Sequence, residues 1–136
     1  MEEIRQKDEK EYAYSIAFLP DIQFITDKYP KKLAPIFDYI IDNKTSKNIK
    51  YVVGLGDMTD RNTQTEWNRV KEQFARLDGV IPYSLVRGNH DGVNYLDNIF
   101  GQKTSAYYKH VEENGGFYSK SSVANTSLLF EENNTK

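Results

Sequence analysis

The sequence has 136 residues and a mass of 15.8 kDa, the size of a single domain. It carries 18 Lys and Arg against 20 Asp and Glu, a formal net charge of −2, so its charge gives no support to nucleic-acid binding. Because cysteine is absent, a metal site would have to use Asp, Glu, His, Asn or Gln as ligands. No apolar stretch approaches the roughly 20 residues that span a bilayer, so we expect no membrane segment.

The first residues differ in character from the rest of the chain. Residues 1–11 contain eight charged side chains, and they have neither the positive start nor the apolar stretch of a signal peptide. We therefore expect a charged, disordered tail over residues 1–11, without an export signal, and one domain over residues 12–136. The cellular compartment stays open.

Two strand-and-helix units are predicted first. Residues 14–19 (YSIAFL) form a short apolar run that ends at Pro20, as a strand does on entering a loop. Residues 51–55 (YVVGL) are apolar almost without interruption, which is typical of a parallel strand covered on both faces. A helix is predicted after Pro30, with apolar side chains every three or four residues, and another over residues 65–77. The charged residues that we expect to face water on this second helix are Glu66, Arg69, Lys71, Glu72 and Arg76.

A third strand is predicted at residues 82–86 (PYSLV). The alternation of strands and helices indicates two βαβ units with right-handed crossovers, and therefore three parallel strands whose carboxyl ends share one edge. The pattern is weaker beyond Gly92. Residues 95–100 suggest one or two helical turns, residues 104–118 a hairpin or an irregular excursion around two adjacent glycines, and residues 122–130 a last strand.

Polar side chains gather in the loops that follow the three strands, which read DIQ, GDMTDR and RGNHDG. Successive loops carry Asp21, Asp57 and Asn89, at intervals of 36 and 32 residues that suit βαβ units. Ligands of open α/β sheets bind at this edge, where the loops should converge. Because grouped carboxylates repel one another unless a cation neutralises them, the loops predict a site for an ion such as Mn, Fe, Zn or Mg.

The motifs DxQ, GDxxDR and RGNHD, in this order and each after an apolar strand, resemble those of the calcineurin-like metallophosphoesterase superfamily over residues 14–92. The resemblance implies the amino-terminal half of a four-layer α/β/β/α sandwich, built on a βαβαβ core with largely parallel strands. It also implies two adjacent divalent or trivalent metal ions, which polarise a phosphoryl group and hold a bridging hydroxide as the nucleophile. The implied activity is metal-dependent hydrolysis of a phosphoester substrate.

The same resemblance assigns metal ligands to all three loops. Asp21 would ligate the first metal, Asp57 would bridge both, and Asn89 would ligate the second through its carbonyl oxygen. Gln23 stands where most family members have His, and an amide oxygen binds transition metals more weakly than imidazole does. Gln23 is therefore either a ligand of the first metal or a solvent-facing loop amide. Asp21 and Asp57 could instead cap the helices that follow them.

Catalysis and substrate binding are assigned to three further residues. His90 would lie beside the phosphoryl group as a hydrogen-bond donor or general acid, and Asp60 would orient it, raise its pKa and fix its tautomer. Arg61 would hold phosphate oxygens with its planar fork, unless it forms a salt bridge or is solvated. Asp91 is expected to support the ligand residues or to lie in a turn rather than to be a ligand, and His110 is expected to be an ordinary surface or half-buried imidazole.

The later ligands of the family, a His after a further strand and a Gly-His-x-His motif, have no counterpart among these residues, because His110 is the only histidine after His90. We therefore expect the amino-terminal portion of a longer enzyme, which by itself binds metal weakly and turns over little substrate. The alternative is a non-catalytic or degenerate module that binds a phosphorylated ligand or a protein partner. The substrate, the metal pair and the oligomeric state stay open.

Overall fold

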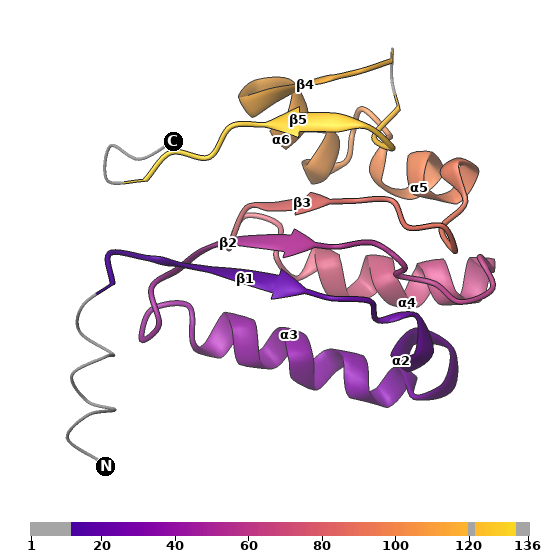
Figure 1. Cartoon of the computed structure of the whole chain (residues 1–136), viewed down its shortest axis with the longest axis horizontal. Helices are drawn as coiled ribbons and strands as arrows, with labels where there is room; N and C mark the ends of the chain where they lie inside the picture. The colour runs from indigo at the N-terminus through magenta and orange to yellow at the C-terminus, as the bar shows by residue number, and fades with distance from the viewer. Residues whose placement is uncertain (1–11, 120–121, 133–136) are drawn as a thin grey trace.

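The computed structural model describes residues 12–119 and 122–132 of the chain (Figure 1). The predicted tail over residues 1–11 lies outside the described residues. The remaining residues form a mixed α/β structure in which a parallel sheet is followed by two helices and a small antiparallel sheet.

Three parallel strands form the central sheet, in the order β1-β2-β3 (Figure 1). They are β1 (Ser15–Leu19), β2 (Ile49–Gly54) and β3 (Tyr83–Leu85). Val52, at the centre of β2, pairs with Ala17 on one side and Tyr83 on the other, and it is completely buried. The predicted βαβαβ core with parallel strands is therefore confirmed.

Two amphipathic helices connect these strands. Helix α3 (Leu33–Asp42) follows a 3-10 turn, Pro30–Lys32, in which the fixed backbone of proline suits a first helical turn. Helix α4 (Gln64–Ala75) begins at the predicted second helical pattern. Phe37 of α3 and Phe74 of α4 meet edge to face with their ring centroids 5.1 Å apart, and both are buried. Aromatic burial of this kind forms the main core of the molecule.

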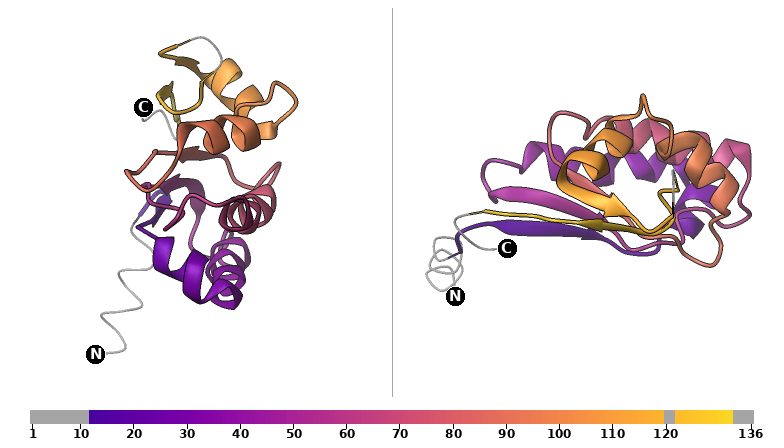
Figure 2. Two further views of the ribbon diagram at one scale, coloured as in Figure 1. Left: turned by 90° about the vertical axis from the view of Figure 1, so that its right-hand side faces the viewer. Right: turned by 90° about the horizontal axis from the view of Figure 1, so that it is seen from above.

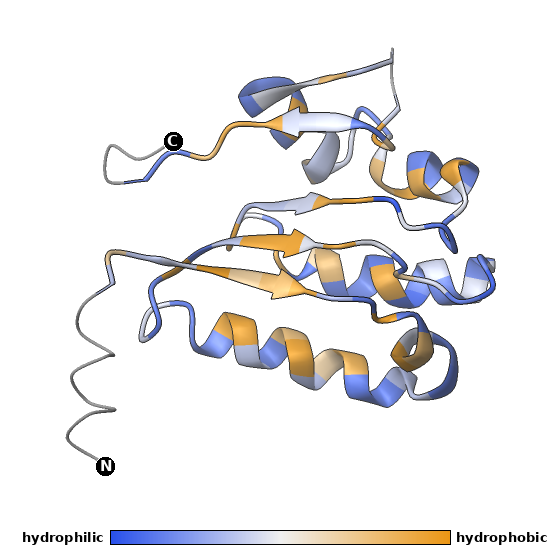
Figure 3. Ribbon diagram, viewed as in Figure 1, coloured by the Kyte–Doolittle hydropathy of each residue, from blue (hydrophilic) through white to orange (hydrophobic). Residues whose placement is uncertain are grey.

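The helices cover one face of the sheet, as Figure 2 shows. The reason is the strand order: two right-handed crossovers that advance in the same direction place their helices on the same side. Apolar residues continue along the strands (Figure 3), yet Phe18, Leu55 and Val86 are 60%, 50% and 49% exposed. The expectation that residues 51–55 are covered on both faces therefore holds for Val52 but is wrong for Leu55.

The region after the third polar loop is more helical than expected. Helix α5 (Val93–Phe100) confirms the helical turns predicted at residues 95–100. Helix α6 (Ala106–Asn114) replaces the hairpin or irregular excursion predicted over residues 104–118, so that prediction is wrong. The helix begins there because the Ser105 hydroxyl accepts a hydrogen bond from the Tyr108 backbone N–H at 3.0 Å, a standard N-cap.

A two-stranded antiparallel sheet follows α6. It consists of β4 (Gly115–Phe117) and β5 (Thr126–Leu128), and β5 is a shorter form of the predicted last strand. The two adjacent glycines, Gly115 and Gly116, are the first residues of β4 and do not form a turn. A side chain at Gly115 would come within 1.8 Å of the Ser127 backbone oxygen, so close strand pairing explains this glycine.

One short helix was not predicted: α2 (Gln23–Lys28), which follows directly on the loop after β1. It packs against α4, where the Arg69 guanidinium donates to the Thr26 backbone oxygen at 2.7 Å. The helices in the described part of the chain are all too short, or too polar, to cross a membrane.

Candidate active site

The three polar loops lie at one edge of the central sheet. Parallel pairing brings the carboxyl ends of β1, β2 and β3 to the same side of the molecule (Figure 1). The pairing continues to the start of the loops, because Leu55 N–H donates to Leu19 O and Val86 N–H donates to Gly54 O, both at 2.9 Å. Side chains from loops that are more than 30 residues apart in sequence can therefore meet.

Asp57 and His90 are in direct contact. The backbone N–H of His90 donates to Asp57 Oδ1 at 2.8 Å. Asp57 has a φ of 47°, in the left-handed region that residues with a side chain seldom adopt. A side chain at Gly88 would come within 2.1 Å of both the backbone nitrogen and Oδ1 of Asp57. Glycine at position 88 is thus what lets the loops after β2 and β3 approach so closely.

A buried carboxylate, that of Asp91, ties the same two loops together. Asp91 is 1% exposed. Its Oδ2 accepts from the backbone N–H groups of Met58 and Gly88, both at 3.1 Å. Its Oδ1 accepts from the N–H and the hydroxyl of Thr59, both at 3.0 Å. These four donors stabilise the buried charge of Asp91 and satisfy both of its carboxylate oxygens. Asp91 thus stabilises the turn in which it lies.

His90 is held through its ring as well as its backbone. His90 Nδ1 lies 2.7 Å from the backbone carbonyl oxygen of Asp60 and 3.8 Å from the Asp60 carboxylate. The short contact of the ring with Asp60 is therefore made by the backbone carbonyl, and the carboxylate lies farther away. Since a carbonyl only accepts hydrogen bonds, Nδ1 carries the proton of the neutral ring and Nε2 is then the unprotonated nitrogen.

The pKa of His90 is raised above its ordinary value of 6.5. The hydrogen bond to the Asp60 carbonyl is the main cause, and partial desolvation opposes it. The negative charges of Asp57, Asp60 and Asp21 raise the pKa further. All three acids singled out in the sequence thus act electrostatically on one imidazole.

Arg61 is largely exposed and faces two acids. Its Nη2 lies 3.5 Å from Asp27 Oδ2, and its Nε lies 3.8 Å from Asp60 Oδ2. Asp27 belongs to α2 and has a lowered pKa, first because of its hydrogen bond to Lys28 and, among smaller contributions, because of the charge of Arg61. The guanidinium of Arg61 therefore rests in ion pairs beside the site, in the manner of the salt-bridge alternative raised by the sequence.

The remaining candidate residues are less tightly connected. Asp21 Oδ1 accepts a hydrogen bond from the backbone N–H of Gln23 at 3.0 Å. Gln23 is the first residue of α2. Asn89 is exposed. Within residues 12–119 and 122–132, no hydrogen bond joins the side chains of Gln23 and Asn89 to the other candidates.

The donor set for a metal ion would be mixed. In the described ranges, no three acidic or histidine side chains come close enough together to hold a metal ion. A site here would need amide oxygens in addition to carboxylates. Gln23 Oε1 suits this requirement because it is buried and has no hydrogen-bond partner among the described residues, a costly state for an acceptor. An unpartnered oxygen two residues from Asp21 fits a hard cation.

Sequence reasoning misplaced one residue and overlooked another. Glu66, expected to face water, is 2% exposed, and its carboxylate accepts hydrogen bonds from the loop that contains Asp60. The sequence does contain a pattern that indicates this position of Glu66, because Thr63 and Glu66 form the T-x-x-E motif of a capping box. Asn62 was overlooked: its Oδ1 accepts from Trp67 Nε1 and from Gly92 N–H, both at 2.8 Å, and so joins the same loop to the next one.

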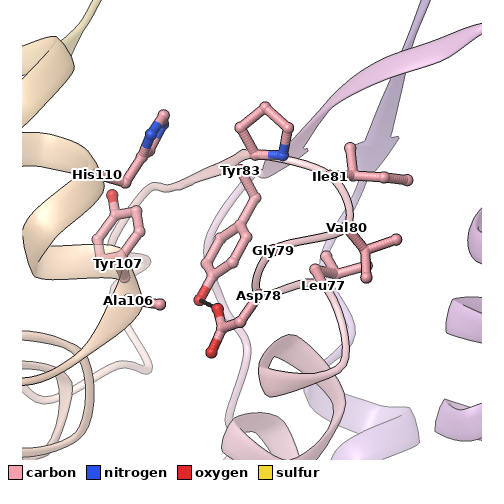
Figure 4. Close-up of a pocket in the computed structure, with 10 residues that line it drawn as sticks. Leu77, Asp78, Gly79, Val80, Ile81, Tyr83, Ala106, Tyr107 and His110 are labelled. Carbon is pink, nitrogen blue, oxygen red and sulfur yellow. Dashed lines mark hydrogen bonds between the residues drawn. The ribbon is translucent and has the colours of Figure 1, made fainter.

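A separate hollow of about 240 Å³ lies at the other end of β3 (Figure 4). Figure 4 shows Tyr83, whose hydroxyl donates to Asp78 at 3.0 Å, with Tyr107 and His110 on the opposite wall. The Nε2 atom of His110 is 3.2 Å from the Tyr51 hydroxyl, and burial lowers the pKa of His110. His110 is thus a half-buried imidazole, as expected, and lies away from the three polar loops.

The fold and the site together define an α/β domain with Asp, Asn and His gathered at the carboxyl edge of a parallel sheet. The family model of the calcineurin-like phosphoesterases matches residues 14–134. The chain therefore belongs to the calcineurin-like phosphoesterase family. It is 32% identical over 89 residues to the uncharacterized protein YvnB of Bacillus subtilis (strain 168). These residues make up 64% of this chain but only 7% of YvnB, so the chain spans a small part of that relative's length.

Proposed function

We propose that this chain carries the site of a metal-dependent phosphoester hydrolase with a dinuclear centre. Family membership supports phosphoester hydrolysis as the general activity. The observation that carries the proposal is the contact of His90 with Asp57 and Asp60, which links two loops at the carboxyl edge of the sheet. A carboxylate and an oriented imidazole at one edge provide the chemistry of metal binding and proton transfer.

Two divalent or trivalent ions, such as Mn, Fe or Zn, would be held by Asp21, Gln23, Asp57 and Asn89. When bound, such ions supply Lewis-acid activation of the phosphoryl group and a nucleophile at neutral pH. The buried, unpartnered Gln23 Oε1 supports a ligand role for this amide. Asp57 keeps one oxygen, Oδ2, outside its hydrogen bond to His90, and this oxygen is available for a ligand.

His90 would act on the leaving group. Its Nδ1 proton is engaged with the Asp60 carbonyl, so Nε2 is the atom that would give a proton to the departing oxygen. The raised pKa keeps a larger share of the ring protonated near neutral pH. Arg61 would exchange its ion pairs with Asp27 and Asp60 for phosphate oxygens, a reasonable exchange because exposed ion pairs are weak.

A second candidate is a non-catalytic module that binds a phosphorylated ligand or a protein partner. One observation favours it: the part of the chain that the structure describes lacks three acidic or histidine side chains placed to share a metal ion. A scaffold of this kind would keep Arg61 and the loop architecture but would not turn over substrate.

Calorimetric titration with Mn²⁺, combined with hydrolysis of p-nitrophenyl phosphate and its diester, tests the proposal. We expect Mn²⁺-dependent turnover in the wild type and a loss of more than about 100-fold in D57N, because metal ions contribute several kcal/mol of charge stabilisation. D42N, at the exposed end of α3, is the control and should match the wild type. Mn²⁺ binding that D57N leaves unchanged would contradict the proposal, and phosphate binding without turnover would support the second candidate.

A further inference from the structure

Among the residues that the structure describes, the buried carboxylate of Glu66 has no salt-bridge partner, so hydrogen bonds alone stabilise its charge there. Its Oε1 accepts from the backbone N–H of Asp60 at 2.8 Å, and its Oε2 accepts from the N–H of Thr63 at 3.0 Å and from the Thr63 hydroxyl at 2.8 Å. The N–H of Arg61 adds contacts at 3.2 Å to both oxygens. A buried charge is tolerated only when it is bonded in this way.

The ionised state of Glu66 agrees with this arrangement. Burial acts to raise its pKa, but the hydrogen bonds from Asp60, Thr63 and Arg61 outweigh burial and lower it. The charged carboxylate therefore binds the backbone N–H groups of Asp60, Arg61 and Thr63, three of the four residues of this loop. Within that loop Asn62 is in the left-handed region, with a φ of 54°, so the loop needs outside contacts to keep its course.

The loop that Glu66 holds is the one that orients His90. Asp60 donates its N–H to Glu66, and the carbonyl oxygen of the same residue accepts the Nδ1 proton of His90. Two hydrogen bonds through a single residue thus connect a helix N-terminus with an imidazole. Among the described residues no hydrogen bond or ion pair joins Glu66 directly to His90, and Asp60 is the residue that is bonded to both.

We infer that Glu66 is a positioning residue that fixes the Nδ1–H tautomer and the orientation of the His90 ring through the backbone of Asp60. The catalytic use of this ring rests on the proposed function, whereas the tautomer does not. If the loop were free, the carbonyl of Asp60 would no longer be held against Nδ1, and the neutral ring would populate both tautomers.

The test is the tautomer of His90, observed by long-range proton–nitrogen NMR on the metal-free chain at a pH above the His90 pKa. The sequence has two histidines, so H110Q assigns the spectrum. We expect a single Nδ1–H form in the wild type and a mixture of both tautomers in E66A. E66Q can still accept from Asp60 N–H through its amide oxygen, and it should restore the single form.

T63A is the matched control. It removes the hydroxyl that caps α4 and binds Glu66, but it leaves the bond from Asp60 to Glu66 in place. A role limited to helix capping predicts the same spectrum change in T63A and E66A, whereas positioning predicts the change in E66A alone. If E66A does not fold, E66D takes its place, because its carboxylate is one methylene too short to reach Asp60.

The inference is overturned if the folded E66A or E66D chain keeps His90 entirely in the Nδ1–H form, or if T63A alters the tautomer equally. The measurement uses neither metal nor substrate. The tautomer of His90 can therefore be interpreted even if the chain proves not to be a hydrolase. Conversely, an unchanged tautomer in E66A would not affect the interpretation of the metal-binding experiment.

Discussion

Two buried carboxylates in this chain bind the backbone of the loops around them. Asp91 and Glu66 each accept hydrogen bonds from loop N–H groups, and neither forms a salt bridge within the described residues. Asp57 accepts one such bond, from the His90 N–H to Oδ1, whereas within the described part of the chain its Oδ2 and the Asp60 carboxylate accept none. The acids near the sheet edge thus differ in how many loop N–H groups their oxygens accept from.

The environment of His90 leads to a prediction on its pKa. D60N removes one negative charge near the ring but keeps the carbonyl that accepts from Nδ1, so the pKa of His90 should fall and yet stay above 6.5. Proton NMR titration of the metal-free chain measures it, with D42N as the control. A pKa at or below 6.5 in D60N would show that the carboxylate, rather than the carbonyl, is the main cause.

The same shift gives stability a pH dependence. Because the folded state raises the pKa of His90, protonation of the ring favours folding. This contribution is complete below the unfolded value near 6.5, and it is lost as the pH rises through the higher folded value.

At the scale of elements, the segment between α5 and β4 forms a helix because a capping residue starts it, although its sequence also contains a pattern typical of turns. Adjacent glycines suggested a hairpin, yet Ser105 starts a helix that continues to Asn114. The Ser105 hydroxyl also donates to the Phe100 backbone oxygen at 2.6 Å, which joins the ends of α5 and α6. Tyr107 of α6 then stacks on Tyr83 of β3 with ring centroids 5.3 Å apart, so the helix is secured to the central sheet.

Removing this cap should measurably destabilise the chain. S105A should lower the free energy of unfolding by about 1 kcal/mol, the usual cost of losing a serine N-cap. Urea denaturation followed by circular dichroism gives the value. The control is S46A, an exposed serine whose hydroxyl makes only 3.5 Å contacts with Asn43. Equal stability of S105A and the wild type would mean that α6 does not depend on its cap.

For the molecule as a whole, the strand order determines where the core lies. Both crossovers place their helices on the same face, so the apolar residues of the sheet divide into a covered and an open set. Phe74 belongs to the covered set and meets the rings of Phe37, Tyr83 and Phe100 at centroid distances of 5.1, 5.2 and 6.0 Å. Phe18 belongs to the open set.

Because one face of the sheet is covered and the other is open, replacing phenylalanine by alanine should reduce stability by different amounts on the two faces. F74A should lower the free energy of unfolding by about 3–5 kcal/mol, because it leaves a cavity among three aromatic rings. F18A should cost less than about 1 kcal/mol, because most of its ring is already in water. Urea denaturation compares the two. Similar losses in both variants would show that the open face is covered in solution.

The sequence by itself determined the order of the three strands and of the two main helices that connect them, although not the short helix α2, and it placed Asp21, Asp57, Asn89 and His90 at one sheet edge. These features follow from side-chain periodicity and from the geometry of parallel βαβ units, which act over short stretches of chain. Only the tertiary structure decided which atom of Asp60 meets His90, that Glu66 is buried, and which face of the sheet stays open. These depend on how loops approach one another in space, and a change of a few ångströms exchanges one hydrogen-bond partner for another.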